Sequence, residues 1–222
     1  MTIPDGNVHL LPQTNQLRAM HTVIRDRSAS SQDFVFYSRR IIRLLLEAAL
    51  DVLPFEKREV TTPVGEVYHG LGFTSKLCAV PVIRAGESME AEVREVLPGL
   101  RIGKILIQRD KVTKLPQLFY SHLPQDIADR HVLLLEPMLA TGGSALTAIR
   151  VLLEAGVREE NIVFVNFLAA PEGIEAVTRA HPAVKIVTTS IEERLNEHAY
   201  MVPGIGDFGD RYFGTVDAGA RR

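Results

Sequence analysis

The stretch 133–144 combines residue types that can hold a phosphate beside a sugar. Its apolar run ends at Glu136 and then passes through Thr141-Gly142-Gly143-Ser144 into a helical pattern, which predicts a strand, a loop and the start of a helix. Backbone N–H groups and hydroxyls of 141–144 can bind an anion at the positive end of that helix. Glu136 can accept hydrogen bonds from sugar hydroxyls or hold a divalent cation. For so short a string, a connecting loop whose glycines serve only the turn is an equal alternative.

A second chemical segment is Arg84-Ala85-Gly86, which also follows an apolar run. If the two preceding strands are neighbours in a parallel sheet, Arg84 lies opposite the 136–144 loop, because ligands bind at the carboxyl ends of such strands. Arg84 and Arg109 could then donate charge-assisted hydrogen bonds to a diphosphate. For either arginine alone, a salt bridge is the alternative.

The third segment runs from Tyr200 to Arg211 and contains three glycines and a proline. Close backbone turns there can expose N–H and C=O groups that match the donor and acceptor edge of a flat heterocycle. Asp207 and Asp210 could bond a ribose hydroxyl, orient a water or cap a turn. Phe208 could instead pack in the core.

Around these segments the chain alternates strand and helix, which predicts an α/β fold with a parallel sheet and helices on both faces. A charged turn between two strand candidates predicts a β-hairpin flap over 109–123.

Residues 1–30 show no strong period, and we expect an arm outside the core whose Arg18, Arg25 and Arg27 form a solvated helix face or a subunit contact. The expected strands are 76–84, 101–110, 117–123, 131–135, 161–169 and 184–191, the expected helices are 33–54, 87–96, 144–154 and 171–181, and a turn is expected at 61–65.

Composition narrows the class of protein. With 222 residues and 46% hydrophobic content, one domain over 1–222 is expected. The net charge of −2 argues against a general nucleic-acid or anionic-membrane binder. The single cysteine, Cys78, fits a reducing compartment and a small core residue. No apolar stretch reaches membrane-spanning length, because Arg43 and Glu47 interrupt the longest candidate, so we expect a soluble, cytoplasmic protein.

The three segments together resemble the uracil phosphoribosyltransferase family, a group of pentosyltransferases. Segments 80–86, 108–110, 136–144 and 202–215 match its motifs, and the last is the specific one. The resemblance implies a phosphoribosyltransferase-type, Rossmann-like fold and transfer of phosphoribosyl from 5-phosphoribosyl 1-diphosphate (PRPP) to uracil, giving UMP and diphosphate in pyrimidine salvage. It further implies Mg²⁺ carried by PRPP, a homodimer or homotetramer, and, in parts of the family, GTP as an effector.

Residue roles follow from the same resemblance. Arg84 and Arg109 belong to the diphosphate side, Asp207 faces PRPP, and these three are the candidate catalytic residues. Uracil would be bound by backbone groups of Met201, Gly206 and Phe208 beside Asp207. The full PRPP set is Arg84, Arg109, Glu136, Pro137, Met138, Leu139, Ala140, Thr141, Gly142, Gly143, Ser144 and Asp207.

One position departs from the family pattern, since Glu136 stands where the family usually has aspartate. The longer side chain moves the carboxylate outward, and catalysis is sensitive to misplacements of ~1 Å. Three other functions stay open: a nucleotide-sensing RNA-binding regulator with the same fold, a sister enzyme for a purine base or orotate, and an inactive partner subunit.

Overall fold

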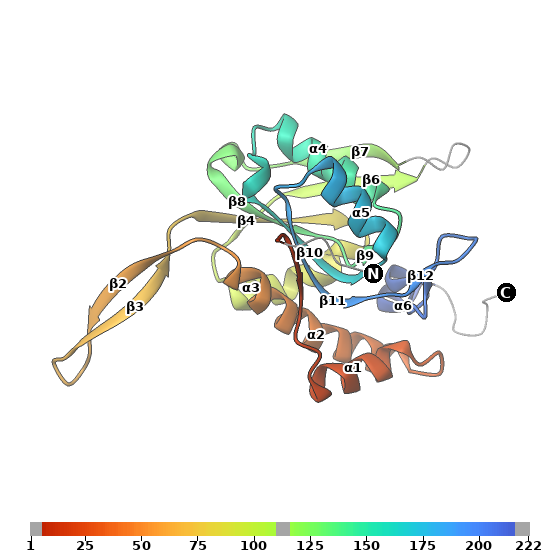
Figure 1. Cartoon of the computed structure of the whole chain (residues 1–222), viewed down its shortest axis with the longest axis horizontal. Coiled ribbons are helices and arrows are strands. Elements are labelled where there is room, and N and C mark those ends of the chain that lie inside the picture. Colours follow the sequence, from red (N-terminus) through yellow and green to blue (C-terminus); the bar gives the residue numbers. More distant parts are fainter. Residues whose placement is uncertain (1–5, 110–115, 216–222) are drawn as a thin grey trace.

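The computed structural model describes residues 6–109 and 116–215, with Arg109 described by its backbone. Its centre is a sheet of mostly parallel strands in the order β1-β11-β10-β8-β4-β6-β7, with β5 beside β4 and β9 beside β10 (Figure 1). Only β7 runs antiparallel to its neighbour within this sheet, among the described residues. The strands are β1 (Val8–Leu10), β4 (Lys76–Ile83), β5 (Arg101–Ile102), β6 (Lys104–Arg109), β7 (Pro116–His122), β8 (Arg130–Leu135), β9 (Met138–Leu139), β10 (Ile162–Ala169) and β11 (Lys185–Ile191).

Helices cover both faces of the sheet, as predicted. Successive residues of β8 point to opposite faces, so Leu133 and Leu135 join one core and Val132 and Leu134 the other. The first core lies under α1 (Asn15–Arg25), α2 (Ser31–Asp51), α3 (Glu90–Val96) and α6 (Phe208–Phe213), and the second under α4 (Gly143–Glu154) and α5 (Pro171–Ala180). Short 3₁₀ helices are η1 (Ala85–Met89), η2 (Ile127–Asp129) and η3 (Glu159–Asn161). No helix of the described chain is long and apolar enough to cross a bilayer.

The long helix α2 confirms the helix predicted over 33–54. Ser30 caps it by accepting a hydrogen bond from the Asp33 backbone N–H at 3.0 Å, which satisfies one of the unpaired donors of the first turn. Phe34, Ile41 and Leu45 recur at helical spacing and are buried. The helix therefore covers the sheet along one apolar stripe.

The amino-terminal segment differs from the expected arm. Helix α1 buries Leu17, Met20 and Ile24 in the first core, and β1 adds an edge strand to β11. These apolar residues do follow helical spacing, but Pro4, Gly6 and Pro12 before them obscure the period over a window of 30 residues. The prediction that residues 1–30 stay outside the core is wrong for α1.

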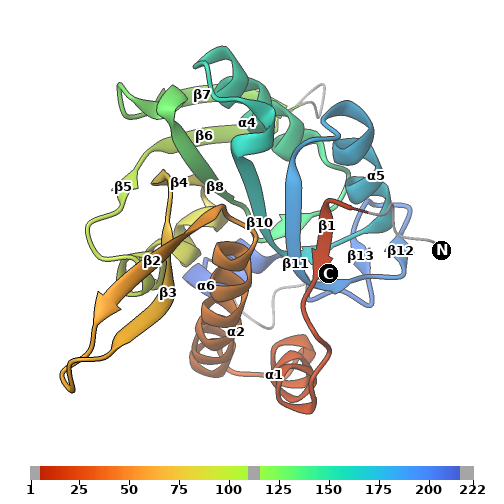
Figure 2. The same cartoon turned by 60° about the vertical axis from the view of Figure 1, so that its left-hand side comes forward.

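A hairpin of β2 (Phe55–Thr61) and β3 (Val67–Phe73) projects away from the sheet in two views (Figures 1 and 2). The predicted turn at 61–65 lies at its tip, where Gly65 has φ of +86°. The strands were not predicted, because most of their residues are exposed on both faces and lack an apolar alternation. Two shorter strands, β12 (Arg194–Leu195) and β13 (Met201–Val202), pair with each other.

The carboxyl ends of β4 and β8 lie side by side, as the sequence predicted. The two strands pair in parallel from Lys76 with Arg130 to Pro81 with Leu135. From β4 the sheet continues outward to β6, and from β8 it continues the other way to β10, so the strand order reverses between them. Such a switch point leaves a crevice beyond the strand ends. Strands β6 and β7 confirm the predicted hairpin beside it, and the tip of the predicted flap, 110–115, lies outside the described residues.

Candidate active site

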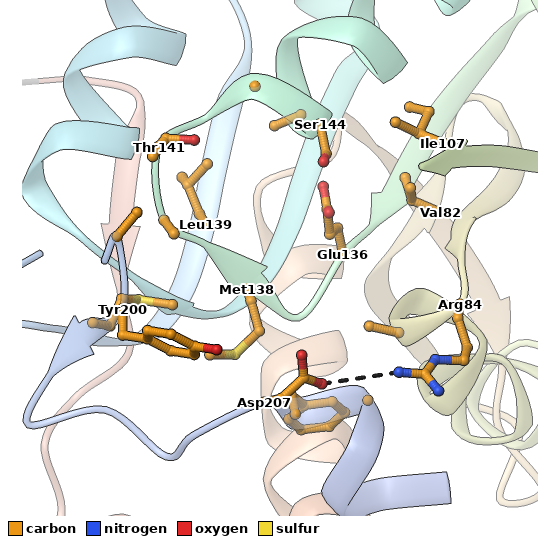
Figure 3. A pocket seen from close by; sticks show the side chains of 18 of the residues that line it. Val82, Arg84, Ile107, Glu136, Met138, Leu139, Thr141, Ser144, Tyr200 and Asp207 are labelled. Atoms are coloured by element: carbon orange, nitrogen blue, oxygen red, sulfur yellow. Dashed lines mark ion pairs between the residues drawn. The ribbon is translucent and has the colours of Figure 1, made fainter. Parts of the chain in front are cut away.

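A cavity of about 790 Å³ lies beyond the carboxyl ends of β4, β6 and β8. It is bounded by the three segments that the sequence singled out, which come together from distant parts of the chain. Thr141 and Ser144 lie at one side, Arg84 and Asp207 at the other, and the Glu136 side chain points into the space between them (Figure 3). The cavity can therefore hold one anionic group against the loop and a second near the arginine.

The loop 136–144 is held from behind by β10. Asn166 donates its side-chain amide to the carbonyls of Glu136 at 3.2 Å and Pro137 at 3.1 Å, and Thr188 in turn donates to Asn166 at 3.0 Å. The backbone N–H of Ala170 also donates to the carbonyl of Leu139 at 2.8 Å. The loop backbone is thus fixed by a buried polar network before any ligand binds.

The amino end of α4 provides the anion-binding geometry. Gly142 has φ of +84°, a left-handed conformation in which a side chain is strained, and it is the N-cap residue directly before the helix. The N–H groups of a first helical turn have no acceptor within the helix, and the helix dipole is positive there. Thr141 and Ser144 add hydroxyls beside the cavity (Figure 3). This arrangement fits a terminal phosphate.

Arg84 is the only arginine or lysine among the described residues that line the cavity. It follows β4 directly, and its guanidinium donates to Asp210 at 2.8 Å and to the Thr215 hydroxyl at 3.0 Å, while Asp207 lies 4.0 Å away. Arg109 ends β6, next to the lining residue Gln108, and its side chain lies outside the description. The positive charge of Arg84 can therefore face a second anionic group.

The loop from Met201 to Phe208 closes the cavity on the other side. Asp207 caps α6 by accepting the Asp210 backbone N–H at 2.8 Å, so one of its predicted alternatives, a capping role, is present. The Phe208 side chain is buried in the first core, where its ring lies 5.5 Å from that of Phe34. At Gly206 and Phe208 the cavity is therefore offered backbone groups rather than polar side chains.

The structure brings nearly all described candidate residues to one cavity. Pro137 is the exception, because it does not line the cavity and instead accepts hydrogen bonds from β10. The prediction missed Gln108, His198, Tyr200 and Ile205 as lining residues. Gln108 and Tyr200 stand directly beside Arg109 and Met201 in the quoted segments, so adjacency was the available signal.

Two carboxylates line the cavity in the described part of the chain and could contribute to metal binding. The described residues contain no cluster of three or more His, Cys, Asp or Glu side chains that could hold a metal ion. Glu136 and Asp207 both line the cavity. This donor set fits Mg²⁺, which is commonly bound by one or two carboxylates together with substrate phosphates and water.

Comparison with known proteins gives a consistent family. The family model described as uracil phosphoribosyltransferase matches residues 11–215. Proteins named uracil phosphoribosyltransferase from Dictyostelium discoideum and Saccharomyces cerevisiae are 55% and 53% identical, covering 98% and 95% of this chain and 100% and 97% of theirs. The structure of the AQ2163 protein from Aquifex aeolicus superposes with a TM-score of 0.81 at 28% identity, over 93% of this chain and 97% of that one. The expected α/β phosphoribosyltransferase-type fold is confirmed, and the chain belongs to the uracil phosphoribosyltransferase family.

Proposed function

We propose that this protein transfers the phosphoribosyl group of PRPP to N1 of uracil, forming UMP and diphosphate for pyrimidine salvage. The proposal rests on one observation: the 136–144 loop, Arg84 and the 201–208 loop line the same cavity. Membership of the uracil phosphoribosyltransferase family supports the choice of base.

The PRPP side is assigned to 136–144, Arg84, Arg109 and Asp207. The ribose 5-phosphate fits the amino end of α4 and the hydroxyls of Thr141 and Ser144, with Glu136 facing the ribose. The diphosphate is assigned to Arg84 and Arg109, whose backbones lie at the carboxyl ends of the paired strands β4 and β6. When bound, Mg²⁺ neutralises part of the diphosphate charge, and Glu136 and Asp207 are the side chains that would hold it together with PRPP.

Uracil is assigned to the 201–208 loop, where backbone groups of Met201, Gly206 and Phe208 match its edge. The structure favours uracil over orotate, whose carboxylate needs a cation. Arg211, at the end of the segment from Tyr200 to Arg211, does not supply such a cation, because its guanidinium donates to the carbonyls of Ile24, Ile205 and Asp26 and lies 4.1 Å from the centre of the Phe34 ring. It does not line the cavity.

The proposed reaction is a displacement at the anomeric carbon of the ribose. The bond from C1′ to the diphosphate oxygen breaks while N1 of uracil bonds to C1′, and N1 loses its proton. Positive charge grows on the ribose and negative charge on the leaving diphosphate, so Arg84, Arg109 and loop amides act by positioning and electrostatic stabilisation. Asp207 belongs to the 201–208 loop as well as to the PRPP set, and it is the candidate to receive the N1 proton or orient a water.

The wider setting is proposed from the same family resemblance. We infer a cytoplasmic homodimer or homotetramer that uses small-molecule substrates and binds neither nucleic acid nor membranes. GTP as an effector belongs to the same set of proposals. The near-neutral net charge of −2 supports the absence of a nucleic-acid surface.

The test is a base panel. Purified protein is incubated with Mg²⁺, PRPP and uracil, orotate, adenine, guanine or hypoxanthine, and nucleotide and diphosphate release are measured. We expect UMP and an equal amount of diphosphate with uracil alone. Purine nucleotide without UMP would reject the assignment to uracil, and no release with any base would favour the inactive partner subunit or the regulator.

A further inference from the structure

Behind the 201–208 loop lies a buried carboxylate that the proposed chemistry does not use. Glu192 follows β11, is 4% exposed and does not line the cavity. It accepts hydrogen bonds from Arg25 at 2.6 and 2.8 Å, from the Ser190 hydroxyl at 3.0 Å and from the Gly204 backbone N–H at 2.7 Å. A carboxylate this deep is therefore fully engaged, and one of its bonds reaches the loop.

Arg25 holds the same glycine from the other side of its peptide. It is the last residue of α1, and its guanidinium donates to the Gly204 carbonyl at 3.1 Å as well as to Glu192. A solvated helix face or a subunit contact was predicted for Arg25. The solvated face is wrong, because the side chain is only 23% exposed and is bonded within the chain, while the subunit contact stays a prediction. Both polar backbone groups of Gly204 are thus bound by one ion pair.

The geometry at Gly204 leaves little freedom. Gly204 has φ of +66°, and an added Cβ would collide with the backbone of Met201. The next carbonyl, that of Ile205, accepts from Arg211, which also bonds the carbonyls of Ile24 and Asp26 at the end of α1. Two consecutive loop residues are therefore tied to the carboxyl end of α1, with Met201 on one side of them and Gly206 on the other.

The Arg25–Glu192 pair is ionised and holds the Gly204 peptide in one orientation. Burial opposes ionisation of Glu192, but the Arg25 and Gly204 hydrogen bonds outweigh it and hold the pKa of Glu192 below its usual range. A bidentate arginine–carboxylate pair fixes orientation as well as distance. A buried ion pair adds little net stability compared with apolar packing, whereas removing one partner leaves the other charge uncompensated.

We propose that Arg25 and Glu192 are positioning residues for the base, fixing Gly204 so that the backbone groups of Met201 and Gly206 meet the edge of uracil. The inference rests on the proposed function. Recognition by backbone groups depends on the loop holding its place, and a displacement of about 1 Å can cost on the order of 100-fold in rate. The 136–144 loop, which provides most of the PRPP site, lies on other elements, so the effect should fall mainly on uracil.

The experiment compares Glu192→Gln, Arg25→Lys, Arg25→Met and the Arg25→Met/Glu192→Gln double variant with wild type. Arg18→Met is the matched control, because Arg18 lies exposed on the same helix. Steady-state rates are measured with uracil varied at saturating PRPP and with PRPP varied at saturating uracil. The rise in melting temperature produced by PRPP with Mg²⁺ is measured in parallel and does not depend on turnover.

We expect KM for uracil to rise about tenfold in the single variants, with KM for PRPP and the PRPP-induced melting shift within twofold of wild type. The double variant should lose no more than the worse single variant, because both act through Gly204. Arg18→Met should match wild type. If Arg25→Met does not fold, the nearly isosteric Glu192→Gln decides.

Three results would overturn the inference: an unchanged KM for uracil, equal rises in both KM values, or a fall in kcat alone, which would report fewer folded molecules. Absence of UMP with the wild-type protein would refute the proposed function itself. UMP formation with an unchanged KM for uracil in the variants would refute only the positioning role.

Discussion

Arg84 Nη2 donates to Asp210 Oδ1 at 2.8 Å, so the guanidinium assigned to the diphosphate is joined to helix α6 in the structure. The Arg84 side chain is 46% exposed and that of Asp210 27%. An ion pair of this exposure contributes about 0–1 kcal/mol, whereas a diphosphate offers Arg84 several charged oxygens. The Arg84–Asp210 pair keeps the arginine near the cavity, and breaking it when PRPP binds costs little free energy.

Replacing Arg84 with glutamine should chiefly affect PRPP. A lost charge-assisted hydrogen bond of about 1.5–3 kcal/mol predicts a fall in kcat/KM for PRPP of about 10- to 100-fold. KM for uracil should change little. Arg94→Gln is the matched control, because Arg94 pairs with Glu90 on the exposed side of α3. Wild-type kinetics with PRPP in Arg84→Gln would remove Arg84 from the diphosphate site.

Glu136→Asp should leave turnover and affinity for PRPP unchanged or improved. The shorter side chain restores the residue usual in the family, and the backbone at Glu136 stays fixed by its bond from Asn166. Steady-state kinetics in both substrates is the measurement. A large loss of turnover would mean that this chain specifically requires the longer carboxylate.

The substitution Gly173→Ala should displace the 136–144 loop of the PRPP site. A Cβ on Gly173, in α5, would lie 2.6 Å from the Ala140 carbonyl oxygen and 2.8 Å from that of Leu139, and backbone atoms cannot move aside cheaply. We expect a loss of about 1–3 kcal/mol in stability and at least a tenfold rise in KM for PRPP. Urea unfolding and kinetics measure the two effects. Gly72→Ala is the control, since its Cβ would meet only the flexible Arg58 side chain; equal damage in both variants would argue against a specific effect on the loop.

His21 should make stability depend on pH. Burial lowers its pKa from 6.5 to about 4, with Arg25 adding to the shift and Glu192 opposing it. Below pH 6.5 the His21 imidazole is protonated in the unfolded chain but stays neutral in the folded chain down to about pH 4. The free energy of unfolding therefore decreases by roughly 2 kcal/mol as the pH is lowered from 7.5 to 5. Urea unfolding of His21→Gln should show a pH dependence weaker by that amount. An unchanged pH dependence in His21→Gln would contradict the prediction.

The sheet and most of the site were predictable because local patterns carry them. Apolar runs that end in Arg84 and Glu136 identify two buried strands and the chemistry at their ends. Parallel strands then require those ends to lie at one edge, and the pairing of β4 with β8 confirms this. The Met201–Phe208 loop was identified by its glycines and proline.

Long-range pairing was not predictable. Arg25 lies in a segment with several breakers, and no local signal connects it with Glu192, 167 positions later. The projecting β2–β3 hairpin was also missed, because exposed strands lack the alternation that burial imposes. Arg211 shows the same limit, since it ends the segment predicted to bind a heterocycle, whereas in the structure its side chain donates to backbone carbonyls.

The Arg25–Gly204 contact joins residues 179 positions apart, which has a consequence for how the protein is made. Contacts of such sequence separation form only after the entropy of closing a long loop has been overcome, and they slow folding. During synthesis, Arg25 emerges early, whereas its partners Glu192 and Gly204 emerge only when almost the whole chain has left the ribosome. The base side of the cavity is therefore the last part to assemble, and a chain cut short before Gly204 could complete the sheet while lacking any place for the base.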